Sequence, residues 1–279
     1  VEVDLSQSSS QAKGPVNCTF NMTRSAVICG ALMAIGREVP ANAGCYRPIS
    51  VIAPLGSVVN ARHPAPVANR MAVGHRVVNA VMGSFAQAVP ERVPASYYGV
   101  SYAYALSANN ADGSRQVYFD LECGGWGGHP DGDGANGFSC GFHNISNTPI
   151  EMIENDYPLT FMQYGLVPNS GGEGKSRGGL GLVREFRLDA PEGTFAANLD
   201  RFKIAPYGLE GGEPGRVGQL ILRRAGSDTE ENLASKVAGL NMKTGDIIRL
   251  ETAGGGGHGN PKDRSKSDIS DDLLEGYTT

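Results

Sequence analysis

Apolar residues recur at every third or fourth position in two stretches of the first third of the chain, as they do in amphipathic helices. The clearer stretch follows Pro66 and stops before Pro90, a residue type that ends helices. Its apolar face consists of Val73, Val77, Val78, Val81, Met82, Phe85 and Val89. A further helix is predicted over residues 21–37, before Pro40. The positions on its apolar face are Met22, Ala26, Cys29 and Met33. Both faces are interpreted as surfaces that pack into the core.

Alternation of apolar and polar residues predicts short strands in the same region and longer ones after it. Residues 1–5 show this alternation, and residues 46–53 form a second candidate strand. Farther along, residues 97–106 and 116–121 flank the turn at 109–113 and are predicted to form a hairpin. The remaining predicted strands cover residues 159–167, 181–188, 194–199, 218–223 and 246–251.

Glycine and proline interrupt the strand-rich part at intervals of roughly ten residues, which favours antiparallel strands joined by irregular loops. The sequence therefore predicts an α+β fold. Two amphipathic helices and mixed strands occupy the first third, and a β-rich, glycine-rich antiparallel region follows. The predicted divisions are an α/β segment at 1–94, a β-rich region at 95–261 and a polar tail at 262–279. The tail is interpreted either as a flexible exit or as a segment that docks elsewhere.

The composition is that of a globular protein without a strongly charged partner. Of the 279 residues, 40% are hydrophobic, which is enough to bury a core. The net charge is −5 with acids and bases interspersed, so we expect neither nucleic acid nor a membrane as a partner. No apolar run approaches the roughly 18 to 20 residues of a membrane span. Residues 1–5 are not a secretory signal, so a cytoplasmic location is expected.

The five cysteines are an odd number, lie far apart and form no Cys-x-x-Cys pair. This pattern argues against a disulfide framework and against a zinc ribbon. The thiols are therefore expected to be reduced and largely buried. Cys140 and His143 are three positions apart, which is at best half of a zinc site. No metal ligand is assigned to the chain from these spacings.

Residues 122–137 hold seven glycines together with the only tryptophan and several reactive side chains. So many glycines need a reason, such as close approach of the backbone to a ligand. The candidate acid/base groups, assigned as catalytic, are Glu122, His129, Asp131 and Asp133. The residues assigned to substrate binding are Gly124, Gly125, Gly127, Gly128, Gly134 and Asn147. A functional loop is the preferred interpretation, and a purely structural loop is the alternative.

A second glycine run occupies residues 254–261, directly after a predicted strand. Two arrangements suit it equally: a close backbone approach to another segment or a ligand, and a flexible linker to the tail. Residues 171–176 end like a phosphate-binding loop, but Asn169 stands where that motif needs a glycine. A tight turn between strands is the better interpretation, so no nucleotide-binding motif is assigned.

Taken together, these segments resemble the B-type subunit of the hydantoinase/oxoprolinase family. The matching motifs follow one another in order over nearly the whole chain. They comprise GPVN at 14–17, NAGC at 42–45 with Arg47 and Pro48, PAPV at 64–67, GGWGG at 124–128 with Asp133 and Gly134, NTPIE at 147–151 with Glu154 and Pro158, SGGEG at 170–174, RGGLG at 177–181, Asp200 and Arg201, Gly208, Gly211 and Gly212, and GGGHGNP at 255–261.

The resemblance implies ATP-dependent chemistry on a carbonyl group. The family includes N-methylhydantoinases, 5-oxoprolinase, related lactamases, and the acetone and acetophenone carboxylases. An A-type subunit, or a fused A-type half, binds ATP and phosphorylates the amide or enol oxygen. The B-type part then carries the activated intermediate to hydrolysis or carboxylation, typically with a divalent metal. Family B-type proteins are considerably longer than this chain, and their histidine and aspartate metal ligands lie in the N-terminal half.

The chain is accordingly expected to be the C-terminal half of a longer B-type subunit and to be inactive alone. The expected function is hydrolysis of a cyclic amide such as a hydantoin, 5-oxoproline or another lactam, together with an A-type partner. The alternatives are a subunit of a ketone carboxylase and a non-catalytic assembly module. If the subunit is catalytic, residues 122–137 are expected to form one wall of a shared pocket whose metal comes from the other half.

Overall fold

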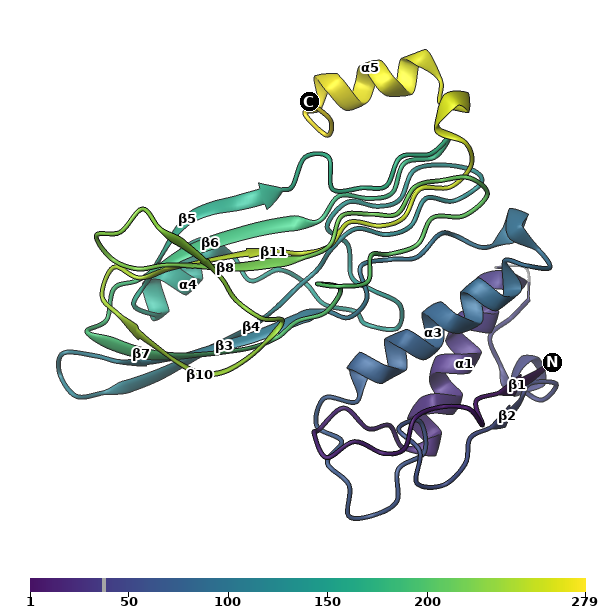
Figure 1. Cartoon of the computed structure of the whole chain (residues 1–279), viewed down its shortest axis with the longest axis horizontal. Helices are drawn as coiled ribbons and strands as arrows, with labels where there is room; N and C mark the ends of the chain where they lie inside the picture. The colour runs from purple at the N-terminus through teal and green to yellow at the C-terminus, as the bar shows by residue number, and fades with distance from the viewer. Residues whose placement is uncertain (37–38) are drawn as a thin grey trace.

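The computed structural model describes residues 1–36 and 39–279. Its N-terminal part holds two helices that pack against each other beside a small parallel sheet (Figure 1). The helical elements here are α1 (Phe20–Ile35), α2 (Ala43–Tyr46), α3 (Met71–Phe85) and the 3-10 turn η1 (Pro90–Arg92). The parallel pair consists of β1 (Glu2–Asp4) and β2 (Ser50–Ile52).

Both predicted helices are confirmed, but the predicted core face of α1 is wrong: of Met22, Ala26, Cys29 and Met33 only Ala26 is fully buried. The residues of α1 that are buried are Thr23, Ala26, Val27, Gly30, Ala31 and Ala34. A local signal accounts for the start of α1. α1 follows Thr19, whose side chain accepts a hydrogen bond from the backbone N–H of Met22 and so caps the helix. The helix ends at Ile35, whereas the predicted end at Arg37 lies outside the described residues. The buried face of α3 includes Val77, Val78, Val81 and Met82, as the apolar spacing predicted.

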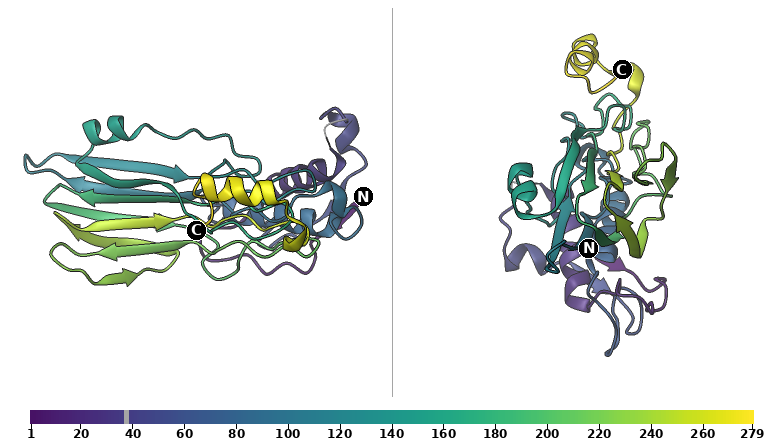
Figure 2. Two further views of the ribbon diagram at one scale, coloured as in Figure 1. Left: turned by 90° about the horizontal axis from the view of Figure 1, so that it is seen from above. Right: turned by 90° about the vertical axis from the view of Figure 1, so that its left-hand side faces the viewer.

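Two antiparallel sheets stack face to face in the rest of the molecule (Figures 1 and 2). One sheet has the order β10–β7–β3–β4 and the other has the order β5–β6–β11–β8–β9. Their strands are β3 (Tyr102–Asn109), β4 (Arg115–Glu122), β5 (Leu159–Leu166), β6 (Leu182–Leu188), β7 (Glu192–Asn198), β8 (Gln219–Arg223), β9 (Glu230–Asn232), β10 (Lys236–Lys243) and β11 (Ile247–Glu251). A short helix, α4 (Ile150–Asp156), precedes β5. The α+β class and the predicted hairpin, formed by β3 and β4, are confirmed.

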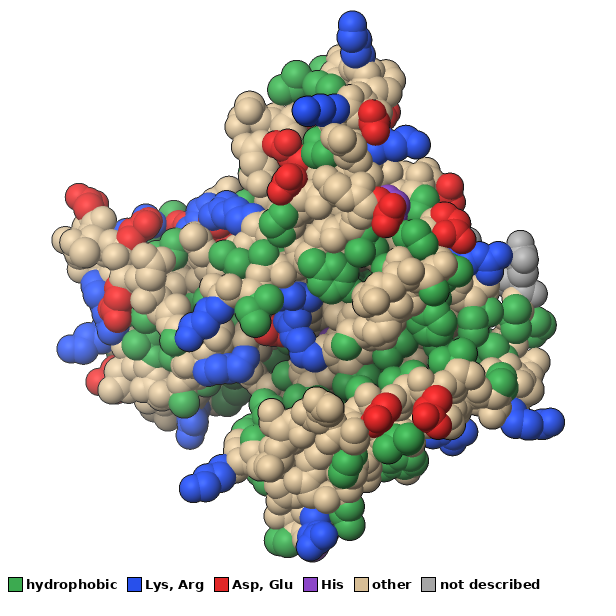
Figure 3. Space-filling model, turned by 45° about the vertical axis from the view of Figure 1, so that its right-hand side comes forward, with side chains coloured by type: hydrophobic (Ala, Val, Ile, Leu, Met, Phe, Trp, Pro, Cys, Tyr) green, Lys and Arg blue, Asp and Glu red, His purple; other side chains and the backbone are tan. Residues whose placement is uncertain are grey.

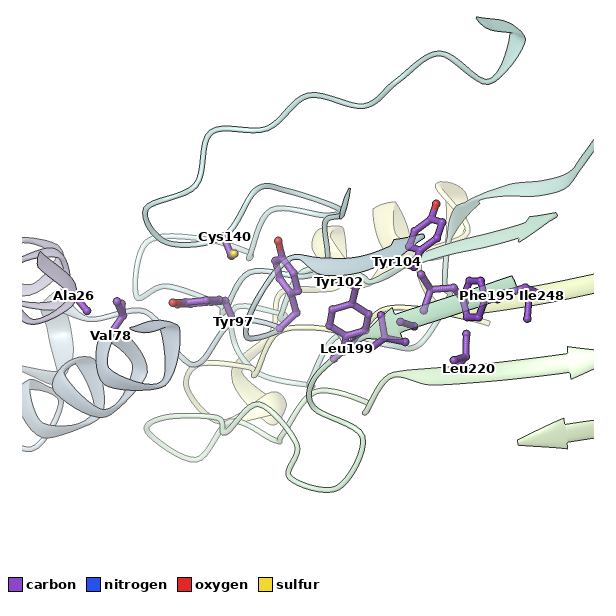
Figure 4. Close-up of a cluster of buried hydrophobic side chains, with 14 of the residues drawn as sticks. Ala26, Val78, Tyr97, Tyr102, Tyr104, Cys140, Phe195, Leu199, Leu220 and Ile248 are labelled. Atoms are coloured by element: carbon purple, nitrogen blue, oxygen red, sulfur yellow. Dashed lines mark hydrogen bonds between the residues drawn. The ribbon is translucent and has the colours of Figure 1, made fainter. Parts of the chain in front are cut away.

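The hydrophobic core is continuous from the helices into the sandwich (Figure 4). Tyr104 of β3 stacks on Phe186 of β6 with ring centroids 5.8 Å apart, and this contact joins the two sheets. Tyr97 and Cys140 lie between the sandwich core and Val78 of α3. Aromatic side chains bury large apolar areas, so they contribute strongly to holding the layers together.

Two predicted strands differ from those in the structure, and two strands, β9 and β10, were not predicted. Residues 46–53 were predicted as one strand, but Tyr46 belongs to α2 and only residues 50–52 pair with β1. The strand predicted from residue 97 begins at Tyr102, because the preceding backbone bonds elsewhere: Tyr98 donates to the carbonyl of Gly125. β10 was missed because it is an edge strand on which only Met242 is fully buried, so apolar alternation is absent.

The glycine-rich segments meet in one bundle between the sandwich, α3 and the C-terminal helix (Figure 1). We define the glycine bundle as residues 124–128, 171–181, 208–215 and 253–258. Segment 253–258 is central, because its backbone forms hydrogen bonds with the other three segments and with Ser96. A strand in a sheet bonds to at most two neighbouring strands, whereas segment 253–258 bonds to more than two segments, so the bundle is not a sheet.

At its closest backbone contacts, the glycine bundle leaves no room for a side chain. A Cβ atom on Gly255 would lie 1.8 Å from the carbonyl oxygen of Trp126, and one on Gly125 would lie 1.9 Å from that of Gly179. Only glycine permits such close approach of two backbones. For residues 254–261, the predicted close approach to another segment is confirmed and the flexible linker is wrong.

The polar tail contains a 3-10 turn, η2 (Pro261–Asp263), and a helix, α5 (Lys266–Leu274), and this helix docks on the glycine bundle. The buried carboxylate of Asp272 accepts hydrogen bonds from Arg177 Nε at 3.1 Å and from Arg264 Nη2 at 2.7 Å. Of the two interpretations of the tail, the docked segment agrees with these contacts. The division of the chain into regions at residues 94 and 261 stays a prediction.

The surface and the thiols agree with the composition. Acidic and basic side chains are interspersed around a hydrophobic area on the face shown in Figure 3. All five cysteines are free; Cys18 and Cys140 are buried and the other three are half-buried. Within residues 1–36 and 39–279, no helix combines the length and the apolar character that crossing a membrane requires.

Candidate functional site

A cavity of about 270 Å³ lies where β4 leads into the glycine bundle and residues 137–147 fold back over it. Glu122 and Asn147, predicted as a catalytic and a substrate-binding residue, both line this cavity. Cys123 and His143 lie in the same wall. The structure therefore brings together one of the predicted acid/base groups and the predicted asparagine, although they are far apart in sequence.

A buried arginine organises the polar groups behind this wall. The Nη1 atom of Arg184 on β6 lies 2.8 Å from Glu122 Oε1 and 2.7 Å from Asp120 Oδ2. Its Nη2 atom donates to Asn147 Oδ1 at 2.5 Å. Tyr104 donates its hydroxyl proton to Glu122 Oε1 at 2.9 Å. These contacts fix both cavity residues through a single guanidinium, which is only 1% exposed.

Glu122 is set apart by its burial. Removal from water raises the pKa of Glu122 to about 7, against the opposing effect of the Arg184 guanidinium. The charge of Asp120 adds to the rise. One guanidinium serves both the Glu122 and the Asp120 carboxylates and cannot fully compensate both, so the effect of burial dominates. A carboxyl group with a pKa near neutrality is suited to accept and return a proton at physiological pH.

This pKa predicts a pH-dependent stability. Between about pH 4.5 and 7, folded Glu122 keeps a proton that the unfolded chain has released, so the free energy of unfolding should fall as the pH rises. The expected contribution is on the order of 2–3 kcal/mol. Urea denaturation of wild type and Glu122→Gln at about pH 5 and about pH 7.5 tests it, since the variant should lose this component. The control is Glu231→Gln, because Glu231 is exposed. If the unfolding free energy of wild type and of Glu122→Gln changed equally with pH, the assignment would be contradicted.

The other three predicted acid/base groups lie elsewhere. His129 and Asp131 line a separate cavity of about 540 Å³ beside Gly36 and Arg92, and the Asp131 side chain is 90% exposed. Their Nδ1 and Oδ2 atoms are 3.5 Å apart. Because these residues do not share a cavity with Glu122, the structure does not assemble the four groups into one site.

Asp133 is held in an ion-pair network at the edge of the glycine bundle. Arg264 Nη2 donates to Asp133 Oδ2 at 2.7 Å, and the backbone N–H of Arg177 donates to Oδ1 at 2.6 Å. Burial by itself would raise the pKa of Asp133, but the hydrogen bonds from Arg264 and Arg177 outweigh it and lower the pKa. Through Arg264, Asp133 is connected to Asp272 of α5. These contacts support a role in docking the tail.

Four of the predicted substrate-binding glycines lie inside the glycine bundle, and the fifth, Gly134, packs against its backbone. Gly124 packs on the ring of Tyr98, and the nearest neighbours of the other four are backbone atoms. Those four are Gly125, Gly127, Gly128 and Gly134. None of the five lines either of the cavities described above. A contact between these glycines and a substrate stays a prediction.

His75 of α3, which was not predicted as a functional residue, lies beside the Glu122 cavity. His75 is fully buried, and its ring stacks on Phe142 with centroids 4.4 Å apart. Its Nε2 atom lies 3.5 Å from Cys140 Sγ, which in turn lies 3.8 Å from His143 Nδ1. Burial lowers the pKa of His75 to about 3, so the imidazole is neutral.

A signal for His75 was present in the sequence. It stands three positions before Val78 and seven before Met82, on the apolar face of the predicted helix. A titratable side chain on such a face needs a buried partner. The sequence could not identify this partner, because Cys140 and His143 come from a loop that the fold brings onto α3.

The chain belongs to the Hydantoinase B/oxoprolinase family, whose sequence profile matches residues 1–261. It is 34% identical over 266 residues to a protein named as the B-type component of a putative D-/L-hydantoinase, from Pseudomonas sp. (strain NS671). This match covers 95% of the chain but 44% of that relative, so the chain spans less than half of the relative's length.

Two solved structures share the fold. The crystal structure of the ATP-dependent caprolactamase from Pseudomonas jessenii is 25% identical with a TM-score of 0.87, and the match covers 98% of this chain and 49% of that one. A nucleotide-free acetone carboxylase structure has a TM-score of 0.80 at 18% identity, with coverage of 99% and 42%. At this lower identity the likeness concerns the fold alone.

Proposed function

We propose that this chain is part of the hydrolytic, B-type subunit of an ATP-dependent cyclic amide hydrolase. The substrate class is a hydantoin, 5-oxoproline or a related lactam. Membership of the Hydantoinase B/oxoprolinase family and similarity to an ATP-dependent caprolactamase support the reaction class. The observation that carries the proposal is Glu122, a buried carboxyl group with a pKa of about 7 in the wall of a cavity.

Glu122 is proposed to move the protons of the hydrolysis. An A-type partner would use ATP to phosphorylate the amide oxygen, which makes that oxygen a leaving group. Attack of water on the activated carbon and cleavage of the C–N bond would leave an acyl phosphate, which a second water would hydrolyse to the carboxylate and inorganic phosphate. In the first of these steps the attacking water releases one proton, and the departing nitrogen requires one. A carboxyl group that titrates near neutral pH can accept the first proton and supply the second. Asn147, held by Arg184, would orient the amide in the cavity.

The divalent metal implied by the family resemblance was expected to have histidine and aspartate ligands. Within the described part of the chain, the group whose potential ligand atoms lie close together consists of His75, Cys140 and His143. A set of two imidazoles and one thiol does not fit that expectation. We therefore assign no step of the amide hydrolysis to a metal.

The test is ATP turnover by the complex of this subunit with its A-type partner. Hydantoin, 5-oxoproline or a lactam should stimulate ATP cleavage, and Glu122→Gln should lower kcat at least about 100-fold while the complex still assembles. The exposed Glu231→Gln is the matched control and should leave kcat unchanged. Stimulation only by a ketone with bicarbonate would indicate the carboxylase alternative. Full turnover by an assembled Glu122→Gln complex would indicate the assembly module.

The same assay separates the remaining predicted residues. His129→Ala and Asp131→Asn should lower kcat if the cavity beside Gly36 takes part in the reaction. Asp133→Asn should instead lower the free energy of unfolding, because it weakens the contact with Arg264 that connects α5 to the glycine bundle. Comparing kcat with a urea denaturation midpoint for each variant distinguishes these two effects.

A further inference from the structure

The side chains of His75, Cys140 and His143 converge in the buried layer between α3 and the sandwich. The ligand atoms of the three residues all lie within 4.8 Å of one another. Cys140 Sγ is 3.5 Å from His75 Nε2 and 3.8 Å from His143 Nδ1. In a tetrahedral zinc site, bond lengths of about 2.3 Å to sulfur and about 2.0 Å to nitrogen place these atoms roughly 3.6 Å apart. The two distances to the sulfur are therefore close to the edges of a zinc polyhedron, and the two histidine nitrogens lie within 4.8 Å of each other.

We propose that His75, Cys140 and His143 bind a zinc-type divalent cation. A thiolate and two imidazoles are ligands that zinc and cobalt accept readily, whereas magnesium and calcium prefer oxygen. Three protein ligands leave a fourth position for water or another small ligand, an arrangement typical of open zinc sites. The inference does not rest on the proposed amide hydrolysis, because it uses only the geometry of this chain.

His75 is oriented for such a role. Its Nδ1 atom lies 2.8 Å from the Tyr97 hydroxyl, and that hydroxyl lies 3.5 Å from the backbone carbonyl of His75. If Tyr97 donates to the carbonyl, Nδ1 must be the protonated nitrogen, and Nε2 then presents its lone pair to Cys140. Histidine ligands usually donate their second N–H in this way, which fixes the ring and its tautomer.

Hydroxyl groups lie beside the proposed ligand atoms. Ser101 Oγ lies 2.8 Å from His143 Nδ1 and 3.5 Å from Cys140 Sγ. The hydroxyl of Tyr98, fully buried beside Cys140 and Ser101, has no hydrogen-bond partner among the described residues. An unpartnered buried hydroxyl is costly, and a water bound to the cation could satisfy it. His143 also lines the 270 Å³ cavity, which gives the cation a route to the site.

Metal binding to the 279-residue chain tests the proposal. After removal of metal with a chelator and dialysis against zinc, one equivalent should remain bound per chain. Substitution with cobalt should give a thiolate-to-cobalt charge-transfer band and the visible bands of a tetrahedral site. Cys140→Ser and His143→Gln should each abolish the cobalt spectrum and reduce bound zinc to background. Tyr97→Phe, which removes only the hydroxyl behind His75, should weaken zinc binding about 10- to 100-fold.

The matched control is Cys123→Ser, because Cys123 lines the same cavity and lies outside the proposed ligand set. This variant should retain one zinc and the full cobalt spectrum. Circular dichroism establishes that each variant is folded. If Cys140→Ser unfolds, the test rests on His143→Gln, because the His143 side chain is only half-buried. The proposal is overturned if the folded wild-type chain binds no zinc. Zinc bound equally by wild type and His143→Gln would also overturn it.

Discussion

Gly255→Ala is expected to prevent folding or to lower the free energy of unfolding by more than about 4 kcal/mol. The new Cβ would lie 1.8 Å from the carbonyl oxygen of Trp126 and close to the backbone N of Gly127. Both contacts involve backbone atoms, and the Trp126 carbonyl also accepts a hydrogen bond from the N–H of Gly179, so no side chain can turn away to relieve the overlap. Urea denaturation followed by circular dichroism measures the effect.

Gly165→Ala is the control for this variant. Gly165 lies in β5, has no atom within 4 Å of an added Cβ and does not have a left-handed φ. Replacing glycine by alanine inside a strand should therefore be neutral or mildly stabilising, by up to about 1 kcal/mol. Equal losses for the two variants would contradict the backbone packing described for the glycine bundle.

Arg184→Leu is expected to have the second-largest effect, a loss of about 3–5 kcal/mol at neutral pH. The substitution leaves the buried carboxylates of Asp120 and Glu122 without their shared cation. It also removes the donor that holds Asn147. The loss should be smaller near pH 4, because Glu122, whose pKa burial raises to about 7, is then protonated and no longer adds an uncompensated charge.

Arg187→Leu on the same strand provides the comparison. The Arg187 side chain is 40% exposed and pairs with Asp189 in contact with solvent. Exposed pairs of this kind contribute little, so the loss should stay within about 1 kcal/mol and change little with pH. Urea midpoints for both variants at about pH 4 and about pH 7.5 make the test. A pH-independent loss in Arg184→Leu would mean that the arginine acts through packing alone.

Much of the fold could be predicted because α3 and the hairpin of β3 and β4 are local elements. Their signals, an apolar face between prolines and a turn between alternating runs, depend on nearby residues only. The glycine bundle is different, since its backbone bonds connect segments far apart in sequence. Glycine content predicted close approach there, but it carries no information about which segment is approached.

The arrangement of the residues around the candidate cavity could be predicted only in part, for the same reason. Glu122 and Asn147 were predicted as separate residues, and only the fold shows that Arg184 connects them. His129 and Asp133 are near Glu122 in sequence, but the fold places both of them outside the cavity that Glu122 lines. Local density of reactive groups is therefore a weaker guide than the partners that each group finds. His75 is the opposite case. It lies on an apolar face of α3, and its titratable partners Cys140 and His143 come from a distant loop.

The position of segment 253–258 also has a consequence for the order in which the molecule folds. The other glycine segments precede it in sequence, yet each forms hydrogen bonds with it. During synthesis, the amides of the earlier segments that bond to residues 253–258 stay unpaired until residue 258 has left the ribosome. Contacts between distant residues slow folding, and exposed unpaired backbone favours aggregation. We therefore expect nascent chains that stop before residue 253 to bind chaperones, and chains that include residue 258 to be released from them.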